Sequence, residues 1–144
     1  VTDSLNRGMS SVDVAMSAGS SVSDMLTQLK EKALAASDTS LDTTSRTALN
    51  NDFTSIRDQI TKTLSNATFN GINLVDGTNA NITALANSDG TGKITVAGQD
   101  MSLGGSVVTL AATASFGTAT SAANLLTTID TSISNVSSSS PGTW

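Results

Sequence analysis

The feature of the sequence that most constrains its fold is a run of apolar and small residues that recurs every three or four positions over the first 37 residues. This spacing places the residues on one side of an α-helix, which turns once every 3.6 residues. No proline interrupts the run. The pattern therefore predicts one long helix over residues 1–37. Its stripe consists of Leu5, Met9, Val12, Met16, Gly19, Val22, Leu26, Leu29, Ala33 and Ala36.

Two further helices are predicted, over residues 43–66 and 119–136. The break at 37–42 is rich in Ser, Thr and Asp, which favour caps and turns, and Asp42 or Thr43 is the expected N-cap. Because this break is short, the first two helices should run antiparallel and pack stripe against stripe. The residues expected to pack the helices together are Leu26, Leu29, Leu49, Phe53, Ile56, Ile60, Ile129 and Ile133.

Short alternating runs between the second and third helices predict a region of β-hairpins over about residues 72–110. The segment Phe69-Asn70-Gly71 is the expected turn that leads into it, and Gly104-Gly105 is an expected turn between strands at 101–103 and 107–110. Such thin hairpins should lean on the helices. The predicted fold class is mainly α: an elongated antiparallel helical bundle with a small region of β-hairpins. Residues 1–136 form one domain, and 137–144 form a flexible or truncated tail.

Composition argues against most catalytic and binding functions. The chain has no cysteine, histidine or tyrosine, which removes the commonest general base, zinc ligands and nucleophile activators. We therefore expect no enzyme, no metal site and no cofactor. The net charge of −5 and the scattered basic residues predict no nucleic-acid partner. No apolar run approaches the length of a membrane span, so no membrane partner is expected.

The charged side chains on the first two predicted helices have two interpretations. Glu31 lies between Lys30 and Lys32, and Asp52 and Asp58 lie near Arg57. These groups could form ion pairs between subunits along a filament. Alternatively, they form a solvated helix face with pairs inside each helix, each of which contributes only a few tenths of a kcal/mol. The sequence favours the second interpretation.

Three segments in a fixed order carry a resemblance to a known family. They are LKEKALAAS at 29–37, RTAL at 46–49 with Phe53 beyond it, and ATFNGINL at 67–74. In this order and spacing they resemble bacterial flagellins, and the wording of residues 30–42 is similar to the short flagellins of alphaproteobacteria. The resemblance implies a core rod domain and a structural subunit of the extracellular flagellar filament, which self-assembles for swimming motility. It implies other flagellin subunits, an export chaperone and a cap protein as partners.

The resemblance also has departures. The family has a further N-terminal helix before this stretch and a longer C-terminal helix after it, and together these drive polymerisation. We therefore expect this chain to lack the terminal polymerisation helices and not to grow filaments alone. A hook–filament junction protein and a flagellin-fold cell-surface binding module remain the alternatives.

A final implication concerns a patch by which a vertebrate Toll-like receptor recognises flagellin cores. The family has an Arg, a Leu and a Glu there, and the motif register places Gln28, Lys32 and Asp52 at those positions. The Arg fork is lost, and an apolar contact has become a cation. Since a charge is costly to desolvate in place of an apolar anchor, we expect weak or no receptor signalling.

Overall fold

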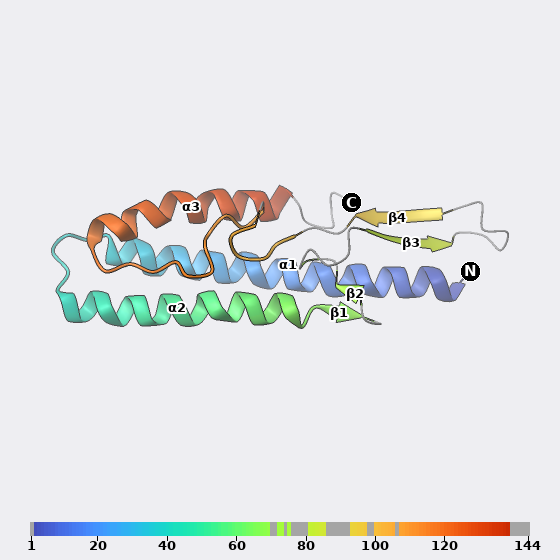
Figure 1. Ribbon diagram of the computed structural model, residues 1–144, viewed down its shortest axis with the longest axis horizontal. Helices are drawn as coiled ribbons and strands as arrows, with labels where there is room; N and C mark the ends of the chain where they lie inside the picture. The colour runs from blue at the N-terminus through green and yellow to red at the C-terminus, as the bar shows by residue number, and fades with distance from the viewer. Residues whose placement is uncertain are drawn as a thin grey trace.

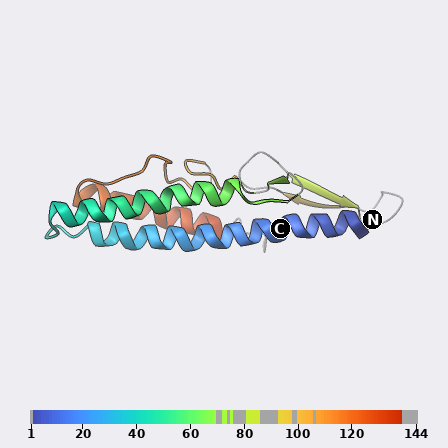
Figure 2. The ribbon, with the colours of Figure 1, turned by 90° about the horizontal axis from the view of Figure 1, so that it is seen from below.

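Three helices lie side by side and give the molecule an elongated, mostly helical body (Figure 1). The computed structural model describes residues 2–69, 72–73, 75, 81–85, 93–97, 100–105 and 107–138. Helix α1 spans Thr2–Ala36, α2 spans Thr43–Ser65 and α3 spans Ala119–Ser138. Both α2 and α3 run antiparallel to α1 and pack on it (Figure 2). Helix α1 is therefore the central element of the bundle.

The turn between α1 and α2 is fixed by two carboxylates and one guanidinium. Asp42 is the N-cap of α2, and its Oδ1 accepts the backbone N–H of Ser45 at 2.7 Å. Asp38 Oδ1 accepts the N–H of Ser40 at 2.9 Å. Arg46 reaches back and donates to the carbonyl oxygens of Ala36 and Asp38 at 3.1 and 2.8 Å. The orphan carbonyls at the end of α1 thus gain a charged donor from α2.

The core follows the stripes of all three helices. Leu26, Leu29, Phe53, Ile60 and Ile129 are fully buried. The other residues of the predicted packing stripe, Leu49, Ile56 and Ile133, are half-buried and pack against this cluster. The three stripes therefore meet around one shared core.

The first third of α1 is oriented differently from the predicted stripe. Met9 and Met16 were expected on the core side, but they are 63% and 46% exposed, and Ala15 and Ala18 are buried instead. An α-helix rotates by 100° per residue, so Met16 lies about 80° around the helix from Leu26. Residues spaced seven apart are each displaced by about 20° around a straight helix, so a stripe with this spacing moves away from the core side along α1.

Two short antiparallel strand pairs lie beside the N-terminal part of α1 (Figure 1). Strand β1 (Thr68–Phe69) pairs with β2 (Ile72–Asn73), with Phe69 opposite Ile72. Strand β3 (Asn81–Leu85) pairs with β4 (Lys93–Ala97), with Thr83 opposite Thr95. The predicted turn residues Asn70 and Gly71 and the end of the predicted tail, 139–144, lie outside the described residues.

Residues 101–105 and 107–118 form a loop where the sequence pattern predicts two strands up to residue 110. Gly104 has a φ of 79°, and its N–H donates to the carbonyl of Leu110 at 2.7 Å. The apolar side chains of Met101, Val108 and Leu110 are fully buried. This segment fills the space between the helices with irregular backbone, and side chains on α3 bond two of its backbone groups in place of a strand partner. The two contacts are Thr109 N–H to Ser132 Oγ, and Asn135 Nδ2 to the carbonyl of Val107.

Candidate interaction surface

The antiparallel pairing of α1 and α2 brings Gln28, Lys32 and Asp52 onto one face of the molecule. Gln28 and Lys32 are one turn apart on α1, and Asp52 lies across from Lys32 on α2. Lys32 Nζ lies 3.5 Å from Asp52 Oδ2, and both side chains are accessible to solvent. The three positions that were singled out by resemblance are thus neighbours in space, and two of them form an ion pair.

The ion pairs of the described residues mostly join helices within one chain. Lys32–Asp52 links α1 to α2, and Lys30 Nζ lies 2.8 Å from Asp130 Oδ1 on α3. Only Arg57–Asp58, at 2.9 Å, lies within a single helix. Neither interpretation of the sequence included these links between helices of the same chain. Because the two pairs between helices are accessible to solvent, each should contribute at most about 1 kcal/mol.

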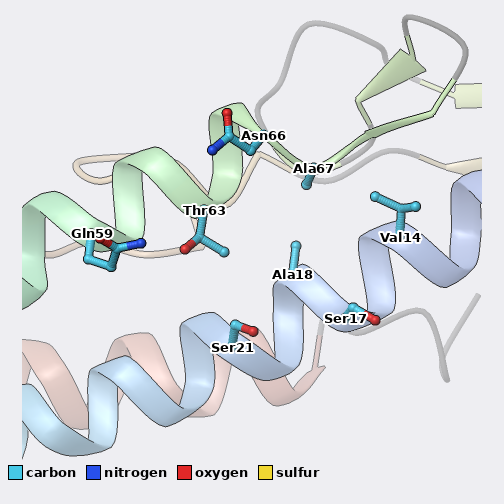
Figure 3. Close-up of a pocket in the computed structure, with 8 residues that line it drawn as sticks. All are labelled: Val14, Ser17, Ala18, Ser21, Gln59, Thr63, Asn66 and Ala67. Carbon is cyan, nitrogen blue, oxygen red and sulfur yellow. The ribbon is translucent and has the colours of Figure 1, made fainter.

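A shallow groove of about 320 Å³ lies farther along the same α1–α2 seam, close to β1 (Figure 3). Small side chains keep it open: Ala18 faces Ala67 and Thr63 across the seam. Its lining consists of Val14, Ser17, Ala18, Ser21, Gln59, Thr63, Asn66 and Ala67. Hydroxyl, amide and methyl groups line this groove without a titratable side chain, so it can offer hydrogen bonds and shape but no acid–base chemistry.

Two charged carboxylates, Asp38 and Asp42, lie in the turn between α1 and α2, at one end of the α1–α2 face. The hydrogen bonds from Ser40 hold the pKa of the Asp38 carboxyl below its usual value, and those from Ser45 do the same for the pKa of Asp42. The charge of Arg46 adds to both effects. Both carboxylates therefore stay ionised in all but acidic conditions.

Two polar side chains, Ser132 and Arg57, hold the loop against the helices through contacts that the sequence did not predict. Ser132 is fully buried; its Oγ accepts the N–H of Thr109 at 3.1 Å and donates to the carbonyl of Thr128 at 2.9 Å. Arg57 Nη1 donates to the carbonyl of Ala114 at 2.7 Å. Ser132 could have been found from its spacing, three residues after Ile129 on the apolar stripe. The partner of Arg57 lies 57 residues away, and no local pattern identifies it.

Among the described residues, no group of three acidic, histidine or cysteine side chains could hold a metal ion. No helix in the described part of the chain is both long and apolar enough to cross a membrane. The surface chemistry of this part is dominated by hydroxyl and amide groups on α2 and α3 and by a few ion pairs.

Comparison with known proteins agrees with this arrangement. A solved structure, the crystal structure of Bacillus cereus flagellin, is similar in fold with a TM-score of 0.81 over 95% of this chain and 78% of that one, at 21% identity. Among curated proteins, flagellin FljM of Caulobacter vibrioides is 53% identical over 133 residues, and flagellin FljK of the same bacterium is 51% identical over 133 residues. Both alignments cover 92% of this chain, which spans about half the length (48%) of each relative.

The family comparison covers the helices that build the candidate surface. The sequence model of the bacterial flagellin N-terminal helical region matches residues 1–80, which include all of α1 and α2. That match takes in Gln28, Lys32 and Asp52, as well as every residue that lines the groove. With more than half of its 144 residues matched in this way, the chain belongs to the bacterial flagellin family.

Proposed function

We propose that the chain is a structural subunit of the bacterial flagellar filament, where it assembles with other flagellin subunits for swimming motility. The observation that carries this proposal is the match of residues 1–80 to the flagellin N-terminal helical region, on a fold in which α2 and α3 pack along α1. Flagellins are structural proteins of the extracellular filament, and the chain is accordingly extracellular, in the bacterial flagellum. An export chaperone and a cap protein are further proposed partners, by analogy with the family.

Open filaments require two different complementary faces on each subunit, because heterologous contacts that do not close generate a helix. We propose the α1–α2 face as one of them. It is long and accessible, and it carries the groove lined by small side chains that another subunit could enter. The low charge of the chain supports this role, since few charged groups would have to be desolvated on assembly.

We also propose that residues 68–97 supply two β-hairpins, β1–β2 and β3–β4, which pack on the N-terminal part of α1 and extend the rod. The antiparallel registers of β1–β2 and β3–β4 support this arrangement. Solution NMR of the chain offers a direct check. Close contacts between Hα protons are expected across every second facing pair, which is either the set that contains Thr83 and Thr95 or the set that contains Ile82 and Val96. Random-coil shifts over 81–97 would contradict this part of the proposal.

The experiment that tests the proposed function uses a full-length relative as the frame, because the chain spans about half of those relatives. The aligned part of flagellin FljM is replaced by this chain, and the purified chimera is polymerised from seeds. Sedimentation should show filaments at a yield comparable with FljM. A matched chimera with Ser21→Trp places a bulky ring in the groove from an exposed position of α1 and should stay in the supernatant with unchanged helical content. A chimera that folds but never sediments would contradict the proposal.

A further inference from the structure

The methionines of the chain are sorted by exposure. They are its only sulfur-containing residues, since the sequence has four Met and no Cys. Met9 and Met16 are 63% and 46% exposed, whereas Met101 is fully buried and Met25 is half-buried against the core. The thioethers therefore fall into an accessible pair and a protected residue, with one intermediate.

The accessible pair shares one side of α1. Seven residues separate Met9 from Met16, which is two helical turns, or about 10 Å along the axis. This side of α1 points away from the core residues Ala15, Ala18 and Val22, which are all buried. Loss of apolar character at Met9 or Met16 therefore affects side chains that lie outside the core cluster of the bundle.

Exposed thioethers react with peroxides. In this reaction the sulfur attacks one oxygen of hydrogen peroxide and the O–O bond breaks. The sulfur becomes a sulfoxide, and the second oxygen is released as water. The sulfur loses two electrons and the peroxide gains them. Thiolates normally compete for such oxidants, but this chain has none.

We infer that Met9 and Met16 form a surface site for reversible oxidation by peroxides, which reacts while the fold stays intact. A sulfoxide at either position projects into water and costs the bundle little. A sulfoxide at Met101 would place a strong dipole in the core, where Met101 Sδ lies 3.9 Å from the position that a side-chain carbon on Gly19 would take. The inference does not depend on assembly into a filament.

The test treats the purified chain with graded hydrogen peroxide and follows each methionine by peptide mass spectrometry. Met9 and Met16 should oxidise at least about tenfold faster than Met101, with Met25 between them, because susceptibility follows exposure. The thermal unfolding midpoint should stay unchanged while only the fast pair has reacted. Methionine sulfoxide reductases should then restore the original mass.

A double variant provides the matched control. Met9→Leu with Met16→Leu keeps the side chains apolar and should abolish the fast uptake of two oxygen atoms, while the slow oxidation of Met101 continues. Two outcomes would overturn the inference. One is oxidation of Met101 at the same rate as Met9 and Met16. The other is a fall in the unfolding midpoint after the fast pair alone has reacted.

Discussion

Lys32 of α1 and Asp52 of α2 form an ion pair, with Nζ and Oδ2 3.5 Å apart. They are two of the three positions at which the sequence resemblance predicts a receptor-recognised patch. A cation that already has an intramolecular partner must lose both that partner and its water before an apolar receptor surface can cover it. The pair therefore adds to the cost of desolvation expected from the sequence.

This arrangement predicts weak or no signalling through the Toll-like receptor that recognises flagellins. Replacing Gln28→Arg, Lys32→Leu and Asp52→Glu together restores the residue types of the family and should raise the response at least tenfold in a receptor reporter-cell assay. Such a gain corresponds to about 1.4 kcal/mol of binding free energy. Lys62→Leu, an exposed cation elsewhere on α2, is the control and should leave the response unchanged. A full response from the unaltered chain would refute the prediction.

Gly19 gives a prediction about stability. It lies inside α1, and a Cβ there would meet only Met101 at 3.9 Å, an ordinary van der Waals distance. Gly19→Ala should therefore raise the free energy of unfolding by up to about 1 kcal/mol through helix propensity. Gly104→Ala is the opposite case, because a φ of 79° strains any side chain, and it should lower stability by about 1 kcal/mol. Urea unfolding measures both, and equal effects of the two substitutions would contradict this account.

Ser132 gives a second prediction about stability. Ser132→Ala leaves the N–H of Thr109 without its acceptor beside a fully buried position, and we expect a loss of about 1–3 kcal/mol. Ser134→Ala, two residues on and exposed, should change the unfolding free energy by less than about 0.5 kcal/mol. If the two variants unfold at the same urea concentration, the hydrogen bond between Ser132 and the loop does not contribute to the stability of the fold.

The turn carboxylates predict a dependence on pH. Asp38 and Asp42 have pKa values below their usual one because Ser40 and Ser45 bond to the charged form. A lowered folded-state pKa means that their contribution is present above the unfolded pKa of about 4 and is lost as pH falls through the folded values. The urea midpoint should therefore fall below about pH 4. Asp42→Asn keeps the N-cap without the charge and should weaken this fall. An unchanged pH profile in that variant would show that Asp42 does not cause the loss of stability at low pH.

Much of the fold could be predicted from the sequence, since the helical spacing of apolar residues reports on local geometry. Asp42 was one of two expected N-caps, and the structure identifies it as the cap. The side of α1 that Met9 and Met16 occupy could not be predicted, because small residues such as Ala15 and Ala18 bury as readily as large ones where helices approach closely. The strands expected at 101–103 and 107–110 were wrong. Side chains of α3 bond the backbone of Val107 and Thr109, and the N–H of Met101 donates to the carbonyl of Val75.

The candidate surface could be predicted only in part, because its contacts depend on how two helices pack. The motif register placed Gln28, Lys32 and Asp52 on two helices, but nothing local to the sequence says that Lys32 and Asp52 meet. That contact depends on the axial register of α1 against α2, which the turn at 37–42 fixes through Arg46, Asp38 and Asp42.

The most direct test of the proposed function is electron microscopy of a bacterium that lacks its own flagellins and carries the FljM chimera that contains this chain. The account predicts external filaments and restored swimming, with the Ser21→Trp chimera exported but unable to build filaments. Cells that export the folded chimera into the medium and remain bare and non-motile would contradict the claim that this chain is a filament subunit.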